Sequence, residues 1–131
     1  MIKNNNPCNI RNTKTKWQGE TTLDEEFESF SSPEMGLRAA MKIINTYYYK
    51  HGMHTIRQII NRWAPPSEND TDSYQAYVSE KMGIGIDDFI DMNKENMIKL
   101  IKPMTIMENG HPKHSKQWYD NATFEKAYDL L

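Results

Sequence analysis

This sequence has one cysteine, no long apolar run and no excess of positive charge, and each of these shortages excludes a class of protein. Cys8 can form no disulfide within the chain, and no cysteine-rich metal pattern is present. Hydrophobic residues make up 37% of the chain, and no run of them is long enough to cross a membrane. The net charge of -2 lacks the basic excess of a protein that binds many phosphates. We therefore expect no membrane insertion and no general affinity for nucleic acids, and any site for a polyanion would have to be local.

The length of 131 residues is enough for one domain, which we assign to 1–131. The first seven residues contain no apolar core and no small-residue cleavage site, so they do not form a secretory signal peptide. If the protein acts outside the cytoplasm, another agent must deliver it.

Apolar residues recur at helical spacing after position 32, whereas 1–32 contain only scattered ones. Capping residues, prolines and glycines mark where each helical pattern begins and ends. The fold class predicted from this pattern is mainly α, a small helical domain with an irregular, short-strand N-terminal lobe. Helices are predicted over 33–50, 55–63, 71–82, 87–92, 94–107 and 121–130.

Glu108 continues the apolar stripe of the helix that precedes it. It follows Met97, Ile101 and Met104 at the spacing of one helix face, so its side chain is expected to face the interior. Partial desolvation and a nearby helix C-terminus both favour the protonated form of a carboxyl group. A general acid that works near neutral pH needs such surroundings. The alternative is a glutamate that begins a surface turn.

A second polar cluster follows Trp63 and contains Glu68, Asn69 and, one turn later, Tyr74. This pattern also has a plain structural explanation, because Asp70 or Thr71 can cap the helix that begins there. Capping alone accounts for the polar residues without any catalytic role.

Two histidine pairs raise the question of a zinc hydrolase. The HxxH pairs begin at His51 and His111, but Gly52 in the first and Pro112 in the second disfavour presentation on a rigid helix. The sequence also lacks a glycine-rich phosphate loop, a nucleophile elbow and a dinucleotide fingerprint. We therefore expect neither a metal nor an organic cofactor.

Several short motifs stand out along the chain: NNPCNIR (5–11), WQG (17–19), FESF (27–30), EMGLRA (34–39), the segment 63–74 and ENG (108–110). Together they resemble a family of small phage proteins described as endolysins or virion structural proteins. The usual first motif of that family reads NNPGNIR, and Cys8 replaces its glycine here. The family in turn resembles lysozymes and bacterial glucosaminidases with the order of segments changed, as in a circular permutation.

The resemblance implies an enzyme that cleaves the glycan strands of bacterial peptidoglycan, with Glu108 as the general acid. Glu68 would be a second carboxylate that activates water or stabilises charge. Trp63 would pack beneath the cleft. The residues expected to line the cleft and bind substrate are Asn5, Asn6, Asn9, Asn69 and Tyr74.

The same resemblance sets expectations for the protein's surroundings. It would be a monomer that stays in the host cytoplasm until a holin releases it to the wall, or that travels in the virion. Hydrolysis and transglycosylation both remain open, and so does a non-catalytic virion protein that keeps the fold for assembly or wall binding.

The resemblance also predicts how the domain is arranged around Glu108. The helix that ends at Glu108 should run through the middle of the domain, between the helices at 33–50, 55–63 and 71–82. Glu108 should face a groove whose opposite wall is the lobe 5–30. Pro103 should kink that helix or begin a new turn in it.

Overall fold

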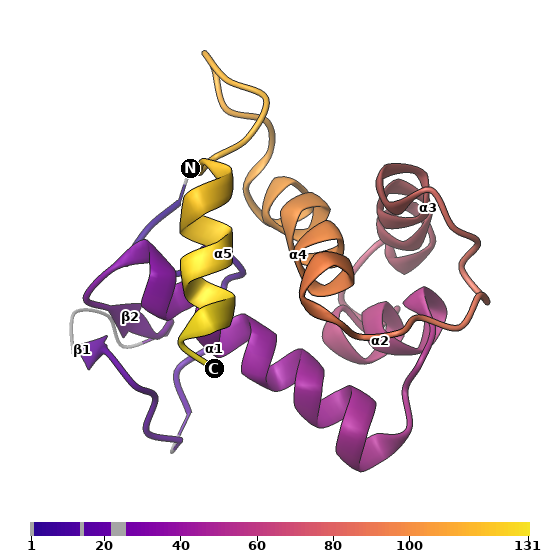
Figure 1. Cartoon of the computed structure of the whole chain (residues 1–131), viewed down its shortest axis with the longest axis horizontal. Coiled ribbons are helices and arrows are strands. Elements are labelled where there is room, and N and C mark those ends of the chain that lie inside the picture. Colours follow the sequence, from indigo (N-terminus) through magenta and orange to yellow (C-terminus); the bar gives the residue numbers. More distant parts are fainter. Residues whose placement is uncertain (1, 14, 22–25) are drawn as a thin grey trace.

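The computed structural model describes residues 2–13, 15–21 and 26–131. The fold is mainly helical, as predicted, with a small lobe of loops and two short antiparallel strands at the N-terminus. Figure 1 shows α4 in the middle of the molecule, with α5 on one side and α3 on the other. The elements are β1 (Glu20–Thr21), β2 (Ser29–Phe30), α1 (Pro33–Asn45), a π-helical turn (Thr46–Lys50), α2 (Ile56–Trp63), α3 (Thr71–Met82), α4 (Lys94–Asn109) and α5 (Asn121–Asp129).

The helices begin where side chains can cap their first turns. The hydroxyls of Ser32 and Thr55 accept backbone N–H groups at the starts of α1 and α2, and the Asp70 carboxylate does the same for α3. Gly83 ends α3 and Gly110 ends α4, both with a positive φ that glycine adopts at little cost. These local signals explain why most of the predicted helix bounds agree with the structure.

The helix predicted over 87–92 is wrong, because this segment is irregular. Its backbone is used by another element: the Ile90 N–H donates to the His54 carbonyl, and the Ile86 carbonyl accepts the Arg57 N–H. The Asp88 carboxylate accepts the Gly85 N–H and holds a tight turn. Tertiary hydrogen bonds to the start of α2 therefore replace the helical ones.

The apolar core forms around α4, as the sequence predicts. Met97, Leu100, Ile101 and Met104 are fully buried, and α4 packs against α3, α5 and α1. α2 packs against α3. The prediction had placed the helices at 33–50, 55–63 and 71–82 around α4, and it did not include α5. The helix continues through Pro103 to its end at Asn109, so no new helix begins at the proline. α4 therefore carries Glu108 from the core to the surface.

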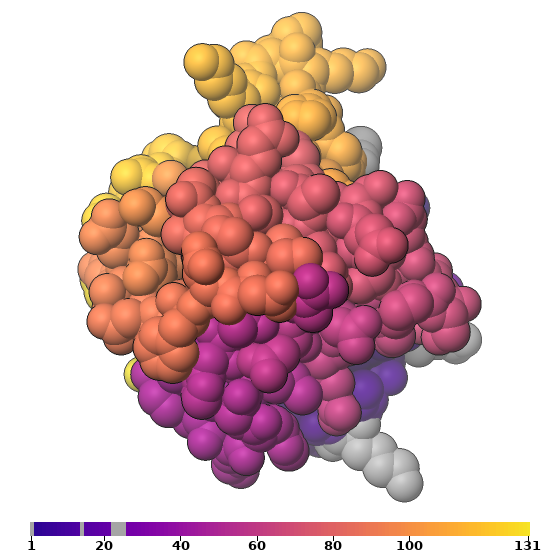
Figure 2. Space-filling view, turned by 90° about the vertical axis from the view of Figure 1, so that its right-hand side faces the viewer, coloured from indigo at the N-terminus to yellow at the C-terminus, as the bar shows by residue number. Residues whose placement is uncertain are grey.

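The segment between α4 and α5 stands out from the body of the molecule (Figure 2).

Among the described residues, no helix is long and apolar enough to span a membrane.

Candidate functional site

The asparagine-rich N-terminal segment is built on left-handed backbone conformations. Asn4, Asn5 and Asn9 have φ values of 61°, 52° and 53°, a region in which asparagine is tolerated better than most residues with a side chain. Cys8 does not adopt a positive φ. Cys8, which stands where the NNPGNIR motif has glycine, therefore does not strain the turn.

Asn6 holds this segment together from the inside. Its amide donates to the carbonyl oxygens of Ile10 and Glu28, at 2.8 and 3.0 Å, and its oxygen accepts the Ile10 N–H at 2.9 Å. Asn5 donates to the Phe30 carbonyl at 3.0 Å. The expectation that Asn5 and Asn6 line the cleft is wrong: neither lines the cavity described below, because their amides are used by the backbone of the lobe.

Two contacts dock the segment onto the helices. A Cβ at Gly36 in α1 would lie 1.8 Å from the Asn5 carbonyl oxygen, so only glycine allows this approach. The Asn109 amide at the end of α4 donates to the Pro7 carbonyl at 2.7 Å and to the Thr105 carbonyl at 2.9 Å. The lobe is thus fixed against α1 and against the last turn of α4, which brings Asn9 beside Glu108.

Glu108 is half-buried, and side chains from two distant parts of the chain hold its carboxyl group. The Asn9 amide donates to Oε1 at 3.1 Å and also to the Glu108 backbone carbonyl at 3.1 Å. The Tyr74 hydroxyl donates to Oε2 at 2.9 Å. Both oxygens therefore have a defined orientation. The predicted inward direction of Glu108 is confirmed.

Tyr74 lies behind the carboxyl group instead of lining the cavity, which corrects the expected role. Its ring is almost fully buried. Burial raises the pKa of the Tyr74 hydroxyl well above its usual value, and the negative charge of Glu108 raises it further. Tyr74 therefore stays protonated and remains a hydrogen-bond donor.

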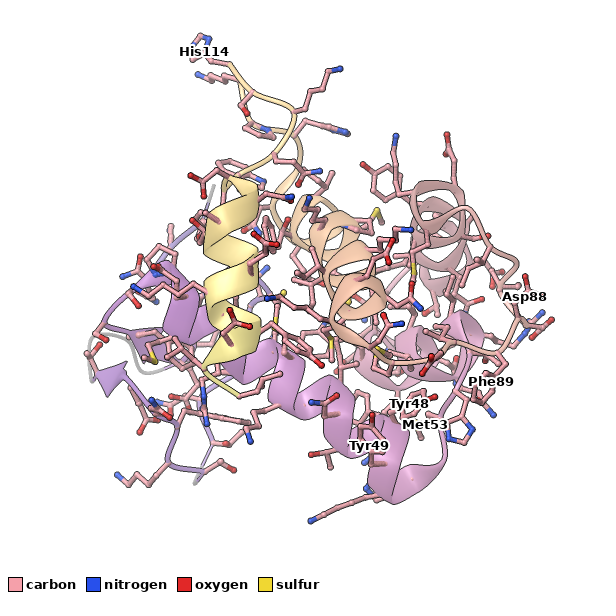
Figure 3. All side chains as sticks on the ribbon, in the orientation of Figure 1. Tyr48, Tyr49, Met53, Asp88, Phe89 and His114 are labelled. Carbon is pink, nitrogen blue, oxygen red and sulfur yellow. The ribbon has the colours of Figure 1, made fainter. Side chains whose placement is uncertain are left out.

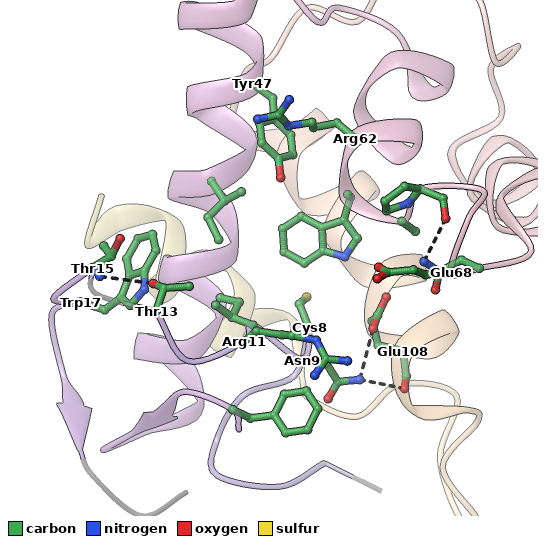
Figure 4. A pocket seen from close by; sticks show the side chains of 17 residues that line it. Cys8, Asn9, Arg11, Thr13, Thr15, Trp17, Tyr47, Arg62, Glu68 and Glu108 are labelled. Atoms are coloured by element: carbon green, nitrogen blue, oxygen red, sulfur yellow. Dashed lines mark hydrogen bonds between the residues drawn. The ribbon is translucent and has the colours of Figure 1, made fainter. Parts of the chain in front are cut away.

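A cavity of about 1030 Å³ opens between the N-terminal lobe and the turn that joins α2 to α3, and Glu108 lies in its wall (Figure 4). Its lining combines carboxylates, guanidinium groups and aromatic rings from both sides. The lining residues are Cys8, Asn9, Ile10, Arg11, Thr13, Thr15, Trp17, Phe27, Ile43, Tyr47, Arg62, Trp63, Ala64, Pro65, Glu68, Asn69 and Glu108.

Glu68 and Asn69 line the same cavity as Glu108, as predicted, but both are exposed. The Asn69 amide donates to the Pro65 carbonyl at 3.3 Å. No described residue pairs with the Glu68 carboxylate. Glu68 is therefore an exposed carboxylate on the opposite side from the lobe, whereas hydrogen bonds orient the Glu108 carboxyl group.

Aromatic rings line the cavity on both sides. Trp63 lines it and is half-buried against the apolar core. Trp17 lines the wall formed by the lobe. Flat aromatic faces of this kind can pack against sugar rings.

Arg11 and Arg62 are lining residues that the sequence did not single out. Arg11 belongs to the NNPCNIR motif, and Arg62 occupies the last turn of α2 just before Trp63. Both arginines lie in or next to motifs that are visible in the sequence, and this position is the signal that could have identified them as site residues.

Cys8 lines the cavity as a buried thiol. Burial raises the pKa of the Cys8 thiol well above its usual value, and the Glu108 charge adds to this rise. Both effects favour the neutral thiol over the nucleophilic thiolate.

The two histidine pairs lie in different surroundings. His54 packs edge-on against Tyr48 with ring centroids 4.5 Å apart, and His114 lies at the far tip of the segment between α4 and α5 (Figure 3). Within the part of the chain that the structure describes, no group of three metal-binding side chains occurs.

Comparison with known proteins places the chain among phage proteins. No family model matches it. It is 41% identical over 114 residues to Protein P5 of Pseudoalteromonas phage PM2, and the match covers 83% of this chain and 70% of the phage protein. The chain therefore belongs to the family of Protein P5 of Pseudoalteromonas phage PM2.

Proposed function

We propose that this protein cleaves the glycan strand of bacterial peptidoglycan, with Glu108 as the general acid. The observation that carries the proposal is the carboxyl group of Glu108, which is half-buried in the wall of a large cavity and oriented by Asn9 and Tyr74. A volume of about 1030 Å³ lies at the upper end of the range of roughly 300–1,000 Å³ for small-molecule sites. Such a cavity can take part of a saccharide chain.

In the proposed reaction, Glu108 protonates the glycosidic oxygen as the bond to the muramic acid C1 breaks and an oxocarbenium-like transition state develops. Water or the 6-hydroxyl of the same sugar then attacks C1 and gives its proton to a carboxylate, either Glu68 or the Glu108 that has just lost its own proton. A glutamate acid of this kind supplies roughly 10²–10⁴-fold of the rate. Glu68, which lines the same cavity, is the candidate for a second carboxylate that activates water or stabilises positive charge. Asn9 and Asn69 would contact the substrate from the two walls.

Membership of a phage protein family supports a role in the phage life cycle. We propose action during host lysis, after release by a holin, or during entry, as a component of the virion. The competing function is a non-catalytic virion protein that binds the wall or takes part in assembly. In that case Glu108, Asn9 and Tyr74 would be only a structural hydrogen-bonded cluster.

Glu108→Gln separates these functions. The amide keeps the shape of the side chain and can still accept from Asn9, but it cannot donate the proton, so wall lysis should fall by on the order of 10²-fold or more. The measurement is the turbidity of purified peptidoglycan and the release of muropeptides. Mass spectrometry of the products distinguishes anhydro-muramyl ends from reducing ends.

Glu80→Gln is the matched control, because Glu80 is exposed on α3 and outside the cavity. It should lyse walls like the parent protein, and both variants should melt like the parent. An inactive parent protein would refute the enzyme proposal. Full activity of Glu108→Gln with a native melting profile would move the acid to another residue, with Glu68 the first to test.

A further inference from the structure

Two guanidinium groups line the cavity of a chain whose net charge is -2, and their surroundings differ. Arg11 on the lobe pairs with Glu26 at 2.7 Å. The Arg62 guanidinium lies over the ring of Tyr47, 5.8 Å from the centroid, and no described carboxylate pairs with it. Figure 4 shows Arg62 and Tyr47 at the end of the cavity away from Glu108. Arg62 is thus a cation in the cavity without a counter-charge from the described chain.

Another arginine on the same helix shows the contrast. Arg57, in the first turn of α2, forms a two-pronged pair with Asp87, at 2.7 and 2.9 Å. Arg57 does not line the cavity. One arginine of α2 is therefore neutralised within the protein, while the other is presented to whatever enters the cavity.

We propose that Arg62 binds a carboxylate of the glycan ligand, so that the cavity selects acidic strands over neutral N-acetylglucosamine chains. The choice of ligand rests on the proposed function. A guanidinium group matches a carboxylate with two parallel N–H donors. The Tyr47 ring restricts the guanidinium to one side of the cavity, which lowers the entropy lost on binding.

Peptidoglycan offers carboxylates from two sources. In a strand without peptides, each muramic acid has a free lactyl carboxylate. In a strand with stem peptides the lactyl group is in an amide bond, and the carboxylates belong to the peptide. The chemistry that Arg62 recognises is the same in both, and the test below distinguishes the two.

The test measures binding, by calorimetry, in protein that carries Glu108→Gln so that no ligand is cleaved. The three ligands are a peptide-free tetrasaccharide of alternating N-acetylglucosamine and N-acetylmuramic acid, the same tetrasaccharide with stem peptides, and neutral chitotetraose. Adding Arg62→Gln should weaken binding of at least one acidic ligand by roughly five- to tenfold. Binding of chitotetraose should not change.

Two further variants sharpen the result. Arg62→Lys keeps the charge but loses the two-pronged geometry. Its affinity for the acidic ligand should therefore lie between that of the protein with Arg62 and that of Arg62→Gln. Arg57→Gln removes the same charge from the same helix outside the cavity and should leave all three affinities unchanged. If Arg62→Gln loses affinity only for the peptide-free ligand, Arg62 binds the lactyl carboxylate. If it loses affinity only for the peptide-bearing ligand, Arg62 binds a carboxylate of the stem peptide.

Three results would overturn the proposal. They are an equal loss of affinity for acidic and neutral ligands, no loss of affinity for either acidic ligand, and no measurable binding of any ligand.

The proposal that the protein cleaves glycan strands can fail independently of the anion site. If Arg62→Gln removes the preference for acidic strands while the parent protein lyses no walls, the anion site stands and the enzyme does not. If Glu108→Gln abolishes lysis and Arg62→Gln changes no affinity, the enzyme stands and the anion site does not.

Discussion

The N-terminal lobe and the helical body are held together by different forces. The lobe contains two strands of two residues each, and its shape depends on asparagine amides that bind backbone groups. The body is held by apolar side chains, many of them completely buried around α4. Hydrogen bonds are directional and apolar packing is not. The lobe should therefore be sensitive to the loss of single polar groups, and the body to the loss of volume.

The candidate site lies where these two regions meet. Asn9 comes from the lobe, Tyr74 and Glu108 come from the body, and the carboxyl group of Glu108 is held by both. Activity should therefore depend on the docking of the lobe, whereas folding should depend mainly on the body.

The largest expected loss of stability follows removal of volume from the body. Ile101 on α4 is fully buried, and Ile101→Ala should lower the free energy of unfolding by about 2–5 kcal/mol. Chemical denaturation followed by circular dichroism measures this, with Ile98→Ala as the half-buried control on the same helix. Equal losses in the two variants would show that the complete burial of Ile101 does not set the size of the effect.

A smaller loss is expected from the lobe. Asn6→Ala removes the acceptor of the buried Ile10 N–H and should cost about 1–3 kcal/mol. Asn5→Gly, which removes a single half-buried hydrogen bond and can adopt the φ of 52° at this position, should cost less. Hydrogen exchange at the Ile10 amide, measured by NMR, should rise more in Asn6→Ala than in Asn5→Gly. Unchanged protection would show that the lobe does not depend on Asn6.

The contact between the lobe and Glu108 should affect activity more than stability. Asn9→Gly removes the donor to Glu108 without straining the backbone, since φ at this position is 53°. The wall-lytic kcat should fall on the order of 10-fold because the acid is less well oriented, with the melting temperature nearly unchanged. A falling melting temperature with unchanged kcat would make Asn9 a purely structural residue.

The smallest effect is expected at high pH, from Tyr119 in the segment before α5. Burial raises the pKa of Tyr119 to about 12 in the folded protein, and the negative charge of Glu34 adds to the rise. An unfolded tyrosine titrates near 10, so the unfolded chain loses this proton first and stability should fall as pH rises from about 10 to about 12. The decline in melting temperature over this window should be shallower in Tyr119→Phe. An identical decline in both proteins would show that other groups cause the loss of stability at high pH.

Much of the fold was predictable because its signals are local. The caps Ser32, Thr55 and Asp70 and the stop at Gly110 lie within a few residues of the helix ends that they define. The apolar stripe through Met97 and Ile101 is also visible in the sequence, and it correctly placed α4 in the core and Glu108 at its edge.

The errors arose where the partner of a polar group lies far along the chain. Nothing near Asn6 indicates that its amide will bind the backbone of Glu28. In the same way, nothing near Ile90 indicates that its N–H will bind the His54 carbonyl. An amide that the fold has already satisfied and one that is free for a ligand look identical in sequence.

By itself, the sequence determined the helical class, most of the helix bounds and the inward direction of Glu108, because periodicity and capping act over a few residues. Only the tertiary structure decided which donors hold the Glu108 carboxyl group, which of the two cavity arginines has a carboxylate partner among the described residues, and which asparagines line the cavity. These properties depend on pairs of groups separated by 34 residues for Tyr74 and Glu108 and by 99 for Asn9 and Glu108. Such pairs meet only after the chain has paid the conformational entropy of folding, so no short segment can encode them alone.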